Sequence, residues 1–116
     1  MDLKQRTKRF ALRIIRLYVA LAKTTEAQVL GKQALRSGTS VGAHYREASR
    51  GRSTAEFVSK IEVGLQELDE TAYWLELLVE AEIVPAKRLE ELCKEVDELI
   101  AILTTCVKNA KLKDEG

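Results

Sequence analysis

Gly38-Thr39-Ser40-Val41-Gly42 matches G-x-S-x-G, the pattern that holds a nucleophilic serine on a sharp strand-to-helix turn in serine hydrolases. That chemistry also needs an acid and a histidine later in the chain. Here the pattern lies inside a helical periodicity, no strand precedes it, and the only histidine, His44, follows Ser40 by four residues. No other candidate base has a nucleophile beside it, so we predict no catalytic residue.

The glycines of this segment have a packing explanation. Gly31, Gly38 and Gly42 recur at helical spacing together with Leu35 and form a thin ridge. Each glycine inside a helix costs about 1 kcal/mol relative to alanine, so three of them imply a compensating gain. We expect another helix to approach closely here, with Gly64 as the candidate partner; a kink near Gly38 is the alternative.

His44 and Glu47 are three residues apart, so one helix could present both to a metal ion. A di-iron bundle needs two Glu-x-x-His motifs and two further glutamates, but the chain has one histidine, and only a site shared between subunits stays open. Cys93 and Cys106 lack C-x-x-C spacing. We predict no metal and no cofactor, and two reduced cysteines in a cytoplasmic protein.

The most promising functional feature is a set of arginines in the basic N-terminal half. Residues 1–52 hold twelve Lys/Arg against three acids, and residues 53–116 hold seven against fifteen. This asymmetry indicates attraction between the halves, a polyanion partner, or both. The candidate nucleic-acid-binding residues are Arg6, Arg9, Arg13 and Arg16 on one helix face and Arg46, Arg50 and Arg52 near the end of the next helix.

These two groups meet at one end of the molecule if the helices that carry them run antiparallel. No aromatic residues interleave with the arginines, so we expect phosphate contacts with steep salt dependence and little base reading. The alternative is a solvated face whose charges pair with neighbouring acids.

Apolar residues at spacings of three and four predict four helices, at about residues 3–23, 26–50, 54–83 and 86–110, in one domain over residues 1–116. Thr25 with Gln28 and Ser53 with Glu56 are candidate capping boxes. Residues 111–116 are expected to fray. Short connections favour an all-α, antiparallel up-down four-helix bundle. The longest uncharged runs have nine residues, so no membrane span is predicted.

Two helices carry more apolar surface than one core needs. A helix of a monomeric bundle usually keeps one apolar stripe, so we expect the extra stripes to form subunit contacts in a homo-oligomer. The residues concerned are Leu12, Ile15 and Val19 on the first helix and Val63, Trp74, Leu77, Leu78 and Ala81 on the third.

Two segments resemble a known family: residues 33–47, which read QALRSGTSVGAHYRE and are followed by Glu56-Phe57 and Gly64, and residues 67–78, which read ELDETAYWLELL. The chain is similar, over about residues 5–110, to bacterial four-helix-bundle proteins encoded in intervening sequences of 23S rRNA genes. It departs from the family pattern at His44, where Asn is usual, at Ala48, where Gly is common, and at Leu65, where Ser often occurs. The side-chain amide that the family usually has at the position of His44 is therefore absent from this chain.

The resemblance implies an antiparallel bundle that assembles as a ring-like homo-oligomer, a pentamer in known members. A related group serves as accessory proteins of diversity-generating retroelements and binds reverse transcriptase and RNA, and no catalytic residues are implied. Residues and resemblance together predict a non-enzymatic oligomer that associates with RNA, or with a nucleic-acid enzyme, through its basic face. The alternative is a protein–protein assembly module with no nucleic-acid role.

Overall fold

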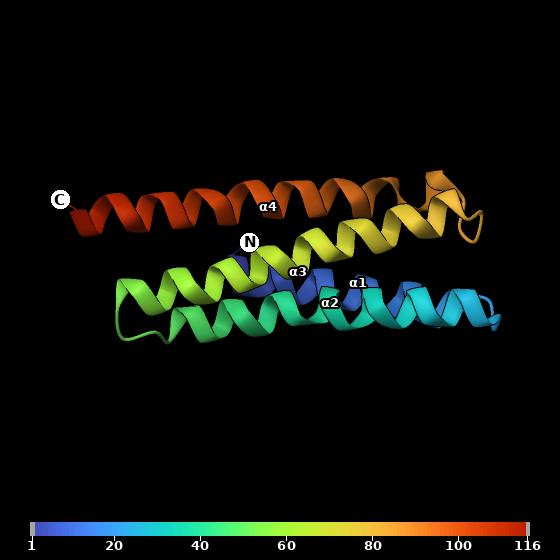
Figure 1. Ribbon diagram of the computed structural model, residues 1–116, viewed down its shortest axis with the longest axis horizontal. Helices are drawn as coiled ribbons and strands as arrows, with labels where there is room; N and C mark the ends of the chain where they lie inside the picture. The colour runs from blue at the N-terminus through green and yellow to red at the C-terminus, as the bar shows by residue number, and fades with distance from the viewer. Residues whose placement is uncertain (1, 116) are drawn as a thin grey trace.

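Four helices make up almost all of residues 2–115, the part of the chain that the computed structural model describes; Met1 and Gly116, the ends of the predicted domain, lie outside it. The helices are α1 (Leu3–Ala20), α2 (Thr25–Ser49), α3 (Thr54–Glu80) and α4 (Ala86–Glu115). Each runs back along the one before, in a rod of 52 × 22 × 20 Å (Figure 1). The all-α prediction is confirmed, and the sequential packing agrees with an up-down bundle.

Side-chain caps begin the first three helices. The side chains of Asp2, Thr24 and Ser53 each accept the backbone N–H three residues later, as N-cap residues do. The predicted cap at Ser53 is confirmed, because its hydroxyl accepts the N–H of Glu56 at 3.1 Å. The Glu56 carboxylate reaches back to the N–H of Arg52, at 2.6 Å, one residue before the position that a capping box uses. The cap predicted at Thr25 is wrong by one residue, because Thr24 takes that role.

Gln28, the predicted partner in the Thr25 cap, joins α2 to α1 instead. Its amide donates to the carbonyl of Ala22, and its amide oxygen accepts from the hydroxyl of Tyr18 at 2.8 Å. The predicted end of the first helix at residue 23 is also too late. The chain becomes extended at Leu21, whose side chain is buried.

The third helix ends before the predicted residue 83. The N–H of Ile83 bonds the carbonyl of Leu78, and the N–H of Glu82 bonds that of Val79, which is the Schellman arrangement. Glu82 has φ 62°, in the left-handed region. The fourth helix extends beyond the predicted residue 110 to Glu115. The predicted frayed tail is therefore wrong for residues 111–115, where good helix formers continue and no breaker intervenes; Gly116 lies outside the described residues.

The glycine ridge of α2 faces α1. A Cβ added at Gly38 would lie 2.8 Å from Cγ1 of Ile14, and one at Gly42 would lie 3.2 Å from Oγ1 of Thr7. The prediction of a close helix approach is confirmed, but the suggested partner, Gly64, is wrong. Gly64 lies on α3, and α2 continues through Gly38 without interruption.

The bundle is closed tightly on three sides only. Helices α1 and α2, α2 and α3, and α3 and α4 pack closely, whereas α1 and α4 approach each other only loosely. The core still includes fully buried residues of every helix, among them Phe10, Val41, Leu68 and Leu99. Within residues 2–115, no helix combines the length and apolar character needed to cross a membrane. The loose side leaves a groove between α1 and α4.

Candidate nucleic-acid interface

The α1–α4 groove collects the predicted arginines of the first helix. Arg6, Arg9 and Arg13 line one hollow, of about 370 Å³, together with Glu95 of α4. A second hollow lies between α1 and the start of α4, and it is lined by Arg13, Arg16, Leu17, Arg88, Leu89, Glu91 and Leu92. Arg13 lines both hollows, so they are neighbours along the α1–α4 groove.

Arg6 forms ion pairs with two acids of α4. Its guanidinium donates to both oxygens of Glu95, at 2.9 and 2.7 Å, and to Glu98 at 3.1 Å. The hydrogen bond with Arg6 lowers the pKa of Glu95, and the same bond raises the pKa of Arg6. For Arg6, the alternative of pairing with neighbouring acids therefore holds.

The remaining arginines of the groove are not paired in this way. Among residues 2–115, no ion pair joins Arg9, Arg13, Arg16 or Arg88 to an acid. Arg88 was missed by sequence reasoning, although a signal exists. It lies in the first turn of α4, which carries no acid, and a cation is unfavourable at the positive end of a helix dipole.

None of the second predicted arginine group lines the α1–α4 groove. Arg50 lines a hollow at the α2–α3 turn together with Glu47, Glu56 and Lys60. That hollow shares no residue with the α1–α4 groove. Arg52 is exposed beside the same turn, and Arg46 is half-buried in the last turns of α2. The structure therefore does not bring Arg50 into the groove.

His44 and Glu47 approach each other on α2. His44 Nδ1 lies 3.3 Å from a carboxylate oxygen of Glu47, and Lys60 Nζ lies 3.0 Å from the other oxygen. The hydrogen bond from Lys60 is the main reason that the pKa of Glu47 is lowered. No third metal-ligating side chain joins them within the described chain.

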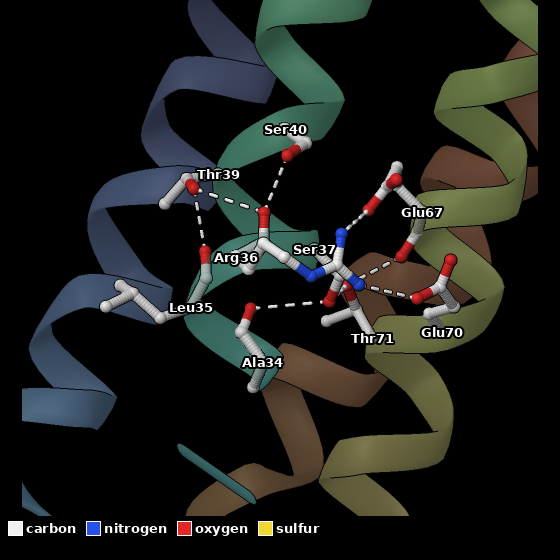
Figure 2. A network of polar contacts seen from close by, with 9 residues as sticks. All are labelled: Ala34, Leu35, Arg36, Ser37, Thr39, Ser40, Glu67, Glu70 and Thr71. Atoms are coloured by element: carbon white, nitrogen blue, oxygen red, sulfur yellow. Dashed lines mark hydrogen bonds and ion pairs between the residues drawn. The ribbon is translucent and has the colours of Figure 1, made fainter. Parts of the chain in front are cut away.

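The G-x-S-x-G hydroxyls are bonded to their own helix. Ser40 donates to the carbonyl of Arg36 at 2.6 Å, and Thr39 donates to that of Leu35 at 2.7 Å (Figure 2). Bonds to the carbonyl four residues back are a common arrangement of serine and threonine inside helices.

A polar seam joins α2 to α3 next to these hydroxyls. The Arg36 guanidinium binds Glu67 at 3.2 Å and Glu70 at 2.6 Å, and the Ser37 and Thr71 hydroxyls meet at 2.7 Å in the core (Figure 2). The bond to Glu70 is the main reason that the pKa of Arg36 is raised. Both segments that carry the family resemblance contribute to this seam. Polar residues of these two segments therefore hold α2 and α3 together.

A model of the family described as 23S rRNA-intervening sequence protein matches residues 1–105. The chain belongs to this family. A crystal structure of a protein of unknown function from the S23 ribosomal protein family of Bacteroides thetaiotaomicron is 38% identical, with a TM-score of 0.87, over 92% of this chain and 99% of that one. Among curated protein sequences, none matches the chain.

In this member of the 23S rRNA-intervening sequence protein family, the two predicted apolar stripes differ in their exposure to solvent. Leu12, Ile15 and Val19 are exposed on α1, with 41, 39 and 68% of their surfaces accessible. In the stripe predicted for the third helix, Val63, Trp74 and Leu77 are half-buried, but Leu78 is fully buried. Ala81 is exposed and is the C-cap that follows α3.

The placement of Leu78 on an outward stripe is wrong. The helix α3 packs against both α2 and α4, so its buried face is wider than a single stripe. Leu78 is three residues from Leu75 and seven from Thr71, and both of those side chains are fully buried. Tyr73, which sequence reasoning missed, is exposed, and its ring centroid lies 5.2 Å from that of Trp74.

Proposed function

We propose that this protein is a non-enzymatic, homo-oligomeric RNA-associated protein whose α1–α4 groove binds phosphate groups. The observation that supports this most strongly is the row Arg9, Arg13 and Arg16, joined across the groove by Arg88. None of the four has an ion-pair partner within residues 2–115. Guanidinium groups bind phosphate oxygens in bidentate fashion.

The row of arginines destabilises helix α1 in the free protein. Arg9, Arg13 and Arg16 follow one another at spacings of four and three on one helix, where like charges destabilise the helix by about 0.2–0.5 kcal/mol per pair. A polyanion in the groove removes that repulsion, and it also meets the positive end of the α4 dipole beside Arg88. Glu91 and Glu95 reduce the positive charge of the groove. Glu95 is paired with Arg6, and the charges of Arg13 and Arg9 also contribute to its lowered pKa.

RNA is the polyanion to test first, because the family description refers to an intervening sequence of 23S rRNA. The arginines of the groove have no aromatic side chain among their lining neighbours. Bases therefore have nothing to stack on there, and binding is expected through the backbone, with little sequence preference.

The test is a gel shift with a single-stranded RNA of about 20 nucleotides at low salt. Replacing Arg9, Arg13 and Arg16 with glutamate should abolish the shift. A matched control makes the same charge change at three exposed lysines outside the groove, Lys32, Lys94 and Lys108, and it should retain binding. Equal losses in the two variants would show that overall charge, and not the groove, attracts RNA.

The second candidate function is a protein assembly module without a nucleic-acid role. The exposure of Leu12, Ile15 and Val19 favours it, because three aliphatic side chains together on one helix face are suited to a protein contact. In that case the wild-type protein assembles normally but fails to shift RNA even at low salt.

A further inference from the structure

Glu95 lies in the same hollow as two of the arginines that are proposed to bind phosphate. Arg6, Arg9 and Arg13 line this hollow together with Glu95, which is the one acid of its lining within residues 2–115. A carboxylate and a phosphate present oxygens to a guanidinium in the same bidentate geometry. Glu95 is therefore a competitor of phosphate that belongs to the protein itself.

Arg6 fixes this competitor in place. Its Nε and Nη2 atoms donate to the two carboxylate oxygens of Glu95, at 2.9 and 2.7 Å, and the two side chains are only 25 and 15% exposed. Arg9 and Arg13 form no ion pair with Glu95 among the described residues. After the hydrogen bond from Arg6, however, the charges of Arg13 and Arg9 also lower the pKa of Glu95. These two arginines are therefore the nearest alternative partners of the Glu95 carboxylate in the hollow.

We propose that Arg6 is a positioning residue of the groove, which binds Glu95 so that Arg9 and Arg13 stay free for phosphate. Without the Arg6 guanidinium, a half-buried carboxylate is left unpaired, which is unfavourable. Turning toward Arg9 or Arg13 restores a partner to Glu95 and takes one arginine away from the ligand. Arg6 then supports RNA binding without contacting RNA. This inference rests on the proposed function of the groove.

The alternative role of Arg6 is a direct contact with a phosphate. Both roles predict that Arg6→Gln weakens RNA binding and makes its salt dependence shallower by one phosphate contact, a change in slope of about 0.7. The two roles differ in the double variant Arg6→Gln/Glu95→Gln. If Arg6 is a positioning residue, no carboxylate remains to occupy Arg9 or Arg13, and the slope returns to that of the wild type. If Arg6 contacts RNA, the slope stays shallow.

Glu98 provides the matched control. It also accepts a hydrogen bond from Arg6, at 3.1 Å, but it does not line the hollow. The double variants Arg6→Gln/Glu95→Gln and Arg6→Gln/Glu98→Gln each lose one cation and one acid, so both keep the net charge of the wild type. We expect the wild-type slope for the first double variant and the shallow slope for the second.

Fluorescence anisotropy with the single-stranded RNA of the gel shift, at a series of salt concentrations, measures these slopes. Circular dichroism checks that each variant folds. If Arg6→Gln does not fold, Arg6→Lys replaces it throughout, because lysine keeps the charge but cannot donate to both carboxylate oxygens in the planar geometry of a guanidinium. The same contrast between Glu95→Gln and Glu98→Gln is then expected.

Three results would overturn the proposal while the proposed function stands. A slope that stays shallow in Arg6→Gln/Glu95→Gln would make Arg6 a direct phosphate contact, and a wild-type slope in Arg6→Gln alone would leave Arg6 without a role in RNA binding. Equal recovery in the two double variants would mean that only the overall charge matters. A wild-type protein that binds no RNA at low salt would instead refute the proposed function, and this inference with it.

Discussion

Gly38 is the position where the packing of α1 on α2 can be tested with a single methyl group. A Cβ at this position would lie 2.8 Å from Cγ1, 3.1 Å from Cγ2 and 3.3 Å from Cβ of Ile14. These atoms form the branch point of a fully buried isoleucine, whose first side-chain torsion has one strongly preferred value in a helix. The side chain cannot turn away, so Gly38→Ala must push the two helices apart.

The size of the effect follows from two opposing contributions. Overpacking a core costs about 1–3 kcal/mol, and replacing a mid-helix glycine with alanine contributes about 1 kcal/mol of helix propensity. We therefore expect Gly38→Ala to lower the free energy of unfolding, by up to about 2 kcal/mol.

Gly64→Ala provides the matched control. A Cβ at Gly64 would meet its nearest neighbours, the Cβ of His44 and the carbonyl of Val41, at 3.9 and 4.0 Å, which is ordinary contact. The propensity gain is then not offset, and this variant should be more stable than the wild type by about 1 kcal/mol.

Urea unfolding followed by circular dichroism, at one fixed protein concentration, measures both changes. The two substitutions are chemically identical, yet they should shift the unfolding midpoint in opposite directions. A Gly38→Ala variant that is stabilised as much as the Gly64→Ala variant would refute the close approach of α1 to α2.

Three further predictions concern polar and backbone features. The hydrogen bond from Arg6 lowers the pKa of Glu95, so Glu95→Gln should lower the free energy of unfolding by about 1 kcal/mol at pH 7. In urea titrations at several pH values, this difference should disappear as the pH falls through the lowered pKa of Glu95. Glu82→Gly should raise the melting temperature by relieving a left-handed backbone that costs about 1 kcal/mol, whereas Glu82→Ala should not. A double-mutant cycle with Ser37→Ala and Thr71→Val should give a coupling energy of about 1 kcal/mol in chemical denaturation, and a value of zero would remove their hydrogen bond from the account.

Much of the fold could be predicted because the periodicity of a helix depends only on residues that are close together in the sequence. The starts of α3 and α4, at residues 54 and 86, agree with the predicted helices. The apparent serine motif was correctly recognised as part of a helix. The glycine ridge was recognised as a contact, but its partner was not, because spacing along α2 defines a direction without identifying the helix that lies there.

The parts that could not be predicted depend on how the helices are arranged around one another. Leu78 is buried because α3 has two close neighbours. Arg6 is neutralised because the start of α1 lies beside Glu95, which is distant in the sequence. Arg88 belongs to the groove only because α4 begins next to the second half of α1. Periodicity within a single helix contains none of this information.

The most direct test of the proposed function is the salt dependence of RNA affinity. For single-stranded RNA, the logarithm of the affinity falls against the logarithm of the salt concentration with a slope of about −0.7 per phosphate contact. Replacing Arg9, Arg13 and Arg16 with glutamine should make the slope shallower by about 2 if each arginine holds one phosphate. An unchanged slope would contradict phosphate binding in the α1–α4 groove.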